Sequence, residues 1–366
     1  MAKDQIVSTL EVRKDQWSDT RVVTEPLSTE LSENEVLLKI DSFALTANNI
    51  SYAGAGDLLG YWRFFPASEG WGRIPAMGWA EVIASAHPNI QTGERVWGFF
   101  PFSTHLQILA GSVKPDGFHD ISAHRADLAP VYARFERASA NPIYDAARED
   151  RDSLLRGLFM TSWLVDDFMD VNKCFGANAC LITSASSKTS IALGYCVKKR
   201  GAMKSIGITS PGNVAFCEAL GCYDRVVTYD AVATLDASEP VVVVDMAGSA
   251  SVLSDLHHHY GDNMKYSCRI GATHYEEMGA VDNLPGATPE FFFAPGHIQT
   301  RSAEIGATKL MVSMGGDFAG FRADSENWLT VEYSRGAEAA EATYQAVLTG
   351  KTNPASGQIV SMWAAE

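Results

Sequence analysis

Residues 179–195 read ACLITSASSKTSIALGY. The apolar start predicts a buried strand, and the continuation to Arg200, with apolar residues at helical spacing and a basic end, predicts a helix. The turn between them holds Ser, Ala, Thr and Lys, at the place where many nucleotide-binding proteins have glycines. Either the serines build a phosphate-binding turn, or this is an ordinary strand-turn-helix.

The sequence around this stretch alternates between strands and helices. Near-continuous apolar runs such as VVVV (241–244) are typical of parallel strands buried on both faces. The predicted strands are 179–184, 203–209, 225–230, 240–247 and 265–273, and the predicted helices are 152–171, 190–200, 212–221 and 249–261. This alternation predicts an α/β fold with a Rossmann-type, doubly wound parallel sheet.

The first 110 residues are instead rich in strand patterns, such as EVLLKIDSFAL (35–45) and ERVWGFFPF (94–102). Residues 52–75 are dense in glycine and aromatic residues, which favours a loop that lines a pocket or packs over a core. Near the C-terminus, residues 337–350 predict a helix and residues 357–363 a final strand. A chain of 366 residues is long enough for two domains.

Composition limits the function. The net charge of −15 argues against nucleic-acid binding, which needs a basic face. The N-terminus lacks the apolar segment of a secretion signal, and no stretch is long enough to span a bilayer, so we expect a soluble, cytoplasmic protein without membrane contact. The six cysteines form no CxxC pair and no zinc-site spacing, so we expect reduced thiols and no metal.

The serine-rich turn has the features that a phosphate group requires. Ser184, Ser187 and Ser190 lie three residues apart, Lys188 adds a positive charge, and the following helix offers its N-terminal dipole. Serine is also a common N-cap, which is the simpler explanation. We predict a phosphate-binding turn with this set of residues: Ser184, Ser186, Ser187, Lys188, Thr189 and Ser190.

The ends of two other strands complete the predicted cofactor site. The tip of the second strand carries Thr209, Ser210 and Asn213 and no acidic residue. A carboxylate there would hold the ribose hydroxyls of NAD, so its absence favours NADP(H). Ala247 and Gly248, after the fourth strand, would let a nucleotide approach closely, although a simple strand-end cap explains them equally well.

Three other motifs are rejected. The Ser187-Lys188-Thr189 sequence lacks both glycines of a Walker A loop. Tyr195 and Lys199 have the spacing of short-chain dehydrogenases but come directly after the turn, too early in such a fold. Residues 257–259 are three consecutive histidines, which point in different directions around a helix, so we expect a solvated face with one buried ring rather than a metal site.

In its order of parts, the chain resembles the medium-chain dehydrogenase/reductase superfamily. The segments that carry the resemblance are 32–54, the strand pair 78–99, the helix start 157–168, the turn and second strand with the element after it at 182–230, and the return 342–363. Trp79, Ala80 and Glu94 depart from the superfamily pattern. The first 173 residues contain no cysteine, so the resemblance is to the zinc-independent quinone oxidoreductase and enoyl reductase branches. Within them, the sequence is most similar to the uncharacterised DUF2855 family.

The resemblance implies a GroES-like β-barrel catalytic domain at 1–150, a Rossmann nucleotide-binding domain at 151–299, and a return to the catalytic domain at 300–366. It also implies a cofactor cleft between the domains and the possibility of a homodimer. Thr161, at the family's Gly-Leu-Thr helix start, joins the predicted NADP(H)-binding residues.

The family's substrate loop corresponds to residues 46–52. We predict Thr46 in this loop, Asn49 and Tyr52 as groups that polarise the substrate or donate a proton, and Tyr61 as a pocket wall. Alternatively, Asn48 and Asn49 form a turn and Tyr52 packs in the domain interface.

The resemblance implies an enzyme, an NADP-dependent oxidoreductase. Its expected reaction is hydride transfer to an activated C=C bond, a quinone or a carbonyl of a hydrophobic, possibly aromatic small molecule. Two alternatives remain: a catalytically inactive binding or regulatory module, and a redox-neutral lyase or isomerase that uses bound NADP.

Overall fold

The computed structural model describes residues 6–270 and 284–365. The chain divides into two units: residues 1–154 together with 330–366 form the first, and residues 155–329 form the second. The chain therefore leaves the first unit once and returns to it at Thr330. The long helix α2 (Glu149–Val171) contains the first crossing point.

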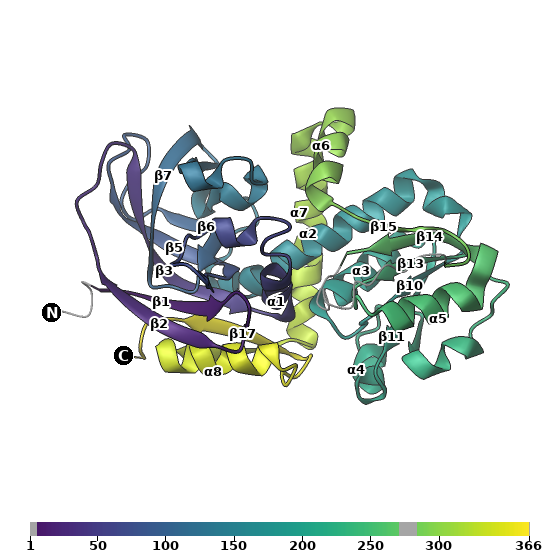
Figure 1. The fold of residues 1–366 in the computed structure, drawn as a ribbon. Helices are drawn as coiled ribbons and strands as arrows, with labels where there is room; N and C mark the ends of the chain where they lie inside the picture. Colours follow the sequence, from purple (N-terminus) through teal and green to yellow (C-terminus); the bar gives the residue numbers. More distant parts are fainter. Residues whose placement is uncertain (1–5, 271–283, 366) are drawn as a thin grey trace. The chain divides into compact units, whose positions relative to one another are not determined.

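The first unit contains a closed β-barrel and a separate three-stranded sheet. The strands of the unit are β1 (Ile6–Arg13), β2 (Thr20–Pro26), β3 (Glu35–Leu45), β4 (Trp71–Gly72), β5 (Pro75–Ser85), β6 (Arg95–Pro101), β7 (His105–Lys114), β8 (Gly117–Asp120), β9 (Arg134–Arg137), β16 (Thr330–Arg335) and β17 (Ser356–Ser361). The three-stranded sheet has the order β2-β1-β4. The order β3-β5-β6-β9-β8-β7 closes because β3 also pairs antiparallel with β7. The predicted β-barrel is confirmed (Figure 1).

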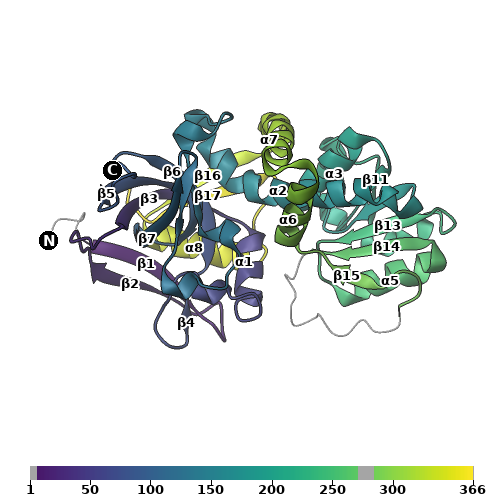
Figure 2. The ribbon, with the colours of Figure 1, turned by 90° about the horizontal axis from the view of Figure 1, so that it is seen from above.

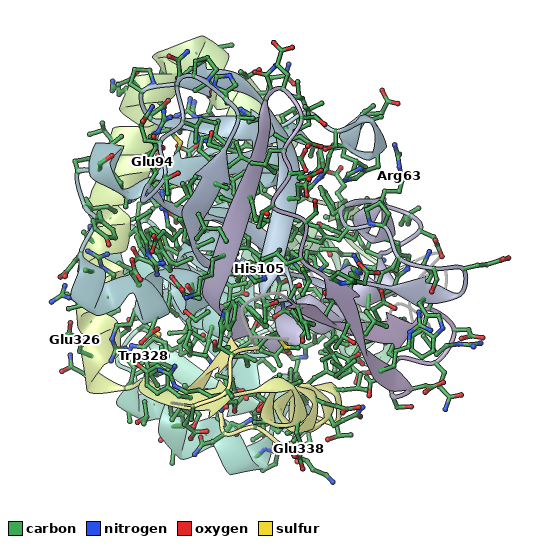
Figure 3. All side chains as sticks on the ribbon, turned by 90° about the vertical axis from the view of Figure 1, so that its left-hand side faces the viewer. Arg63, Glu94, His105, Glu326, Trp328 and Glu338 are labelled. Carbon is green, nitrogen blue, oxygen red and sulfur yellow. The ribbon has the colours of Figure 1, made fainter. Side chains whose placement is uncertain are left out.

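The C-terminal segment extends this barrel. Strand β17 pairs antiparallel with β3, and β16 pairs parallel with β17. Helix α8 (Ala337–Leu348) connects the two strands and buries Tyr344 and Val347 in the same core as β3. In the side view of Figure 3, His105 lies in the barrel wall, whereas Glu338 of α8 lies at the surface. The unit's other helix, α1 (Ala47–Gly54), follows β3 directly.

The second unit is built on a six-stranded, all-parallel sheet. Its strands are β10 (Ala179–Ile182), β11 (Lys204–Thr209), β12 (Arg225–Thr228), β13 (Val241–Asp245), β14 (Met264–Arg269) and β15 (Pro289–Phe291). Their order is β12-β11-β10-β13-β14-β15, the order of a doubly wound dinucleotide-binding fold. The five predicted strands and the Rossmann-type sheet are confirmed; the sixth strand, β15, was not predicted.

Helices α3 (Lys188–Arg200) and α5 (Ala250–Tyr260) lie against this sheet (Figure 2). The unit also contains α4 (Val214–Ala219), α6 (Ala294–Ile305) and α7 (Ala307–Asp324), and Phe321 of α7 packs on Tyr195 of α3. Alternate strand residues such as Leu181 and Val243 pack with Leu253 and Leu256 of α5. This alternation explains why whole strands are apolar, since a second layer covers the other face. Over the described residues, no helix combines the length and apolar character needed to cross a membrane.

The three consecutive histidines lie on α5 as predicted. His257 is completely buried, His258 is exposed and His259 is half-buried. The Nδ1 of His257 bonds the carbonyl oxygen of Pro285 at 2.9 Å, and its Nε2 bonds Ser267 Oγ at 2.9 Å. With one donor and one acceptor, these partners fit a neutral imidazole. Among the described residues, no group of His, Cys, Asp or Glu could hold a metal ion.

This arrangement predicts acid sensitivity of the second unit. Burial lowers the pKa of His257, so the unfolded chain binds a proton there near pH 6.5 while the folded unit does not. The free energy of unfolding of the second unit therefore keeps the full contribution of neutral His257 above about pH 6.5. It decreases as the pH falls further, by up to about 1.4 kcal/mol per pH unit. Urea unfolding between about pH 7.5 and 5.5 measures it. The His257→Gln variant should lose this part of the slope and His258→Gln should keep it; equal slopes in both variants would contradict the prediction.

Candidate cofactor turn and tyrosine cluster

The turn after β10 has the backbone of a glycine loop. Ser184 has a φ of +50°, in the left-handed region that normally favours glycine. A side chain in this conformation costs about 1–2 kcal/mol. At this position the turn therefore has a residue in the left-handed conformation without the glycine that adopts it most easily.

Two of the predicted serines hold the turn together. Ser187 is the N-cap of α3, where its Oγ accepts from the N–H of Ser190 at 3.2 Å. The same Oγ donates to Ser190 Oγ at 2.8 Å, and Ser190 Oγ donates to the carbonyl oxygen of Thr183 at 2.8 Å. Ser190 is completely buried. The N-cap explanation thus accounts for Ser187 and Ser190.

Two residues from neighbouring strand ends contact the turn. The hydroxyl of Tyr229, just after β12, accepts from the N–H of Ser184 at 3.1 Å. Nδ2 of Asn213 donates to Ser186 Oγ at 3.1 Å. Asn213 was predicted at this site and does meet the turn, whereas Tyr229 was missed, because only the β10-β11-β12 order brings it there.

A second tyrosine, Tyr223, forms a hydrogen bond to the backbone of the turn. Tyr223 is 7 % exposed, and its hydroxyl donates to the carbonyl oxygen of Ala185 at 2.8 Å. Its ring lies against Gly194 and Gly207, where added β-carbons would stand 2.7 and 3.1 Å from it. The signal for this residue in the sequence is indirect: two glycines in an otherwise apolar helix and strand make room for a ring.

The side chain of Asp245 caps the end of β13. Asp245 Oδ1 accepts from Thr183 Oγ1 at 2.8 Å and from the N–H groups of Ala247 and Gly248 at 3.1 and 3.2 Å. Burial raises the pKa of Asp245, and its Oδ2 has no hydrogen-bond partner in the described part of the chain. The strand-end cap therefore accounts for Asp245 and orients Ala247 and Gly248 beside the turn.

The other predicted cofactor residues differ in accessibility. Thr209 ends β11, is 1 % exposed and hydrogen-bonds Cys217, whereas Ser210 next to it is exposed. Thr161 lies on α2 and donates within that helix. Its neighbour Ser162, which the sequence did not indicate, is the α2 residue that contacts the turn region, with Oγ donating to the carbonyl oxygen of Thr189 at 2.7 Å.

In the first unit, Thr46 and Asn49 hold the start of α1. Asn49 Oδ1 accepts from the N–H of Thr46 at 2.7 Å, and its Nδ2 donates to the carbonyl oxygen of Pro75 at 2.8 Å. Asn49 is 3 % exposed. Because both ends of its amide are engaged within the unit, this geometry favours the turn interpretation for Asn49 over proton donation.

Tyr52 and Tyr61 belong to a group of rings that we call the tyrosine cluster: Tyr52, Tyr61, Phe64, Phe99 and Tyr132. The ring centroids of Tyr52 and Tyr61 are 4.6 Å apart, and the hydroxyl of Tyr61 donates to that of Tyr132 at 3.2 Å. Burial raises the pKa of all three phenols. All three are therefore protonated at neutral pH, and Tyr61 donates its proton to Tyr132. Tyr132 was not predicted.

Comparison with known proteins yields a family and a fold. The family model described as "Protein of unknown function (DUF2855)" matches residues 43–353. The search among curated proteins returned no match. The similar solved structures include CurA from Vibrio vulnificus in complex with NADPH (12% identity, 99% of each chain covered, TM-score 0.62). A mutant enoyl thioester reductase from Candida tropicalis is 12% identical, with 97% of this chain and 99% of that chain covered and a TM-score of 0.59. A quinone oxidoreductase from Coxiella burnetii is 15% identical, with coverages of 97% and 99% and a TM-score of 0.55. At these identities the likeness establishes the fold.

Proposed function

The chain belongs to the DUF2855 family and has the fold of the medium-chain dehydrogenase/reductases, and on this basis we propose that it is an NADP(H)-dependent, zinc-independent reductase. The observation that carries the proposal is the turn after β10. It combines a left-handed residue, Ser184, with the N-terminus of α3 at the central strand of a doubly wound sheet.

The residues of the turn fit a pyrophosphate. The N–H groups of a helix's first turn have no acceptor within the helix and can bind an anion. In α3, the side chain of the N-cap Ser187 accepts from the N–H of Ser190. Thr189 and Lys188 in that first turn, with Ser186 before it, are the groups that we assign to the phosphates. When bound, the nicotinamide supplies a hydride.

The residues at the end of β11, where the ribose of a nucleotide would lie, favour NADP(H) over NAD(H). Ser210 and Asn213 follow β11, and no carboxylate stands at the tip of this strand to repel a 2′-phosphate. CurA from Vibrio vulnificus, which has this fold, is crystallised with NADPH. Both observations support NADP(H) as the cofactor.

The substrate that we propose is a hydrophobic small molecule with an activated C=C bond, such as an enone or quinone, or with a reactive carbonyl. The tyrosine cluster supports this class, because its rings offer flat apolar faces and its phenols offer donors for a carbonyl oxygen. Tyr52 remains a proposed substrate-polarising group and Tyr61 a proposed wall of this site.

A fluorescence titration with NADPH tests the cofactor assignment. We expect binding at tens of micromolar or tighter, on the ordinary scale of cofactor use. Lys188→Ala should weaken it about tenfold or more, because a charge-assisted hydrogen bond to phosphate is lost. Lys204→Ala is the matched control, since Lys204 begins β11 at the opposite edge of the sheet and pairs with Glu239. Absence of binding to the unaltered protein, or equal affinities of the two variants, would contradict the proposal.

One observation favours an inactive nucleotide-fold protein as the second candidate. The Tyr229 hydroxyl holds the N–H of Ser184, a group that a phosphate would otherwise use. If this contact blocks the turn, Tyr229→Phe should create NADPH binding that the unaltered protein lacks. If the turn is functional, the same variant should bind NADPH no more tightly than the unaltered protein.

A further inference from the structure

Tyr132 makes the one phenol-to-phenol hydrogen bond of the tyrosine cluster. Tyr61 Oη donates to Tyr132 Oη at 3.2 Å, with the two rings nearly perpendicular at 67°. Because Tyr61 uses its proton in this bond, the proton of Tyr132 is directed elsewhere. No group in the described part of the chain accepts it. The pair therefore presents a single donor, and that donor belongs to Tyr132.

The neighbouring rings fix Tyr132 in place. Its ring stacks on Phe99 at 5.1 Å and meets the ring of Phe64 edge-on at 5.6 Å. Tyr61 is 7 % exposed, whereas Tyr132 is half-buried. Tyr132 is therefore the more exposed residue of the pair. Arg63, which ends the short turn with Tyr61 and is labelled in Figure 3, is exposed.

The hydrogen bond also ranks the two phenols as acids. Burial raises the pKa of both, but the donated hydrogen bond lowers the pKa of Tyr132 and raises that of Tyr61. A phenolate at Tyr132 would be stabilised by the Tyr61 O–H, while a phenolate at Tyr61 would lose that bond. Tyr132 is thus the better proton donor of the pair.

We propose that Tyr132 is the proton donor of the reduction, with Tyr61 as its positioning residue; this rests on the proposed function. The Tyr132 O–H binds the carbonyl oxygen of an α,β-unsaturated substrate. A hydride from the bound cofactor would add to the β-carbon. The C=C electron pair would form the new double bond between the α-carbon and the carbonyl carbon, and the carbonyl π pair would move to the oxygen, which takes the proton of Tyr132. The resulting enol tautomerises to the saturated carbonyl compound, and water returns a proton to the Tyr132 phenolate.

Binding of 4-nitrophenolate tests the donor without cofactor or turnover. This planar oxyanion imitates the enolate, and its absorbance reports its ionisation in the bound state. We expect Tyr132→Phe to weaken binding about 10- to 100-fold, as for loss of a hydrogen bond to a charged group. Tyr61→Phe should weaken it less and should raise the pH at which bound 4-nitrophenol ionises, because Tyr132 becomes a poorer donor.

Tyr333→Phe is the matched control, since Tyr333 is an exposed tyrosine of the same unit, outside the cluster, and bonds Asp150. Unchanged far-ultraviolet circular dichroism and melting temperature would show that the variants fold. Absence of binding to the unaltered protein, or a Tyr132→Phe variant that binds as well as the control, would overturn the proposal. A larger loss in Tyr52→Phe than in Tyr132→Phe would also overturn it and make Tyr52 the donor. A protein that binds 4-nitrophenolate through Tyr132 but does not bind NADPH would contradict the proposed function and support the donor assignment.

Discussion

Replacement of Asp120 by alanine is expected to lower the free energy of unfolding of the first unit by about 3–5 kcal/mol. Asp120 Oδ2 accepts from Nε of Arg125 at 3.0 Å, and both side chains are 2 % exposed. The guanidinium lies 5.0 and 4.8 Å from the rings of Phe64 and Phe65, and its Nη1 and Nη2 have no acceptor among the described residues. Without Asp120, a buried positive charge keeps only the rings as partners.

Urea unfolding followed by tryptophan fluorescence measures this effect. The control is Asp116→Ala, which breaks a pair with Arg134 whose side chains are 30 % and 55 % exposed, and which should cost no more than about 1 kcal/mol. The double variant Asp120→Asn, Arg125→Met should recover much of the lost stability, because it removes the buried charge as well. Similar losses for Asp120→Ala and Asp116→Ala would show that the buried pair does not stabilise the unit.

The Tyr223→Ala variant is expected to destabilise the second unit by about 3–5 kcal/mol and to weaken NADPH binding. The ring fills the space over Gly194 and Gly207, so its removal leaves a cavity between α3 and β11. The hydroxyl holds the carbonyl oxygen of Ala185 in the middle of the candidate phosphate-binding turn. One side chain therefore links the core of the unit to the shape of this turn.

Tyr223→Phe separates the two roles, because it keeps the ring and removes the hydrogen bond. We expect a loss of about 1–3 kcal/mol, since the carbonyl oxygen of Ala185 stays buried without its donor. Affinity for NADPH should fall in this variant as well if the turn binds phosphate. Chemical unfolding and the fluorescence titration provide the two readouts. A phenylalanine variant with normal stability would show that the hydroxyl is dispensable.

Local patterns predicted most of the fold. The five apolar strands, the long helix before them and the C-terminal helix and strand were predicted because each has a clear period and clear ends. Strand β15 was missed because it has three residues and begins with a proline. Helix α7 was missed because Gly315 and Gly316 lie inside it, where local preference disfavours a helix.

The sequence indicated only those residues of the candidate site that lie close together in the chain. The turn around Ser184 was predicted from the spacing of its serines, and the loop leading to Tyr52 and Tyr61 from the family resemblance; the roles of these residues stay predictions. Tyr229 and Tyr132 join these sites through strand order and ring packing, which one sequence without relatives does not reveal. Asn49 illustrates the opposite case: its residue type suggested chemistry, but its amide holds the start of α1.

The discontinuity of the first unit has a consequence for biosynthesis. Strand β17 pairs with β3 through Gln358 and Leu45, and Tyr344 of α8 is fully buried in the barrel core. More than three hundred residues separate these partners in the sequence. The ribosome therefore finishes residues 155–329 before it synthesises the C-terminal segment that pairs with β3. Because domains generally fold as units during synthesis, the Rossmann unit can finish folding first on the ribosome. Strands β16 and β17 and helix α8 can join the barrel only after they leave the exit tunnel, so nascent chains that end before Thr330 should contain a folded Rossmann unit and a barrel that lacks these three elements.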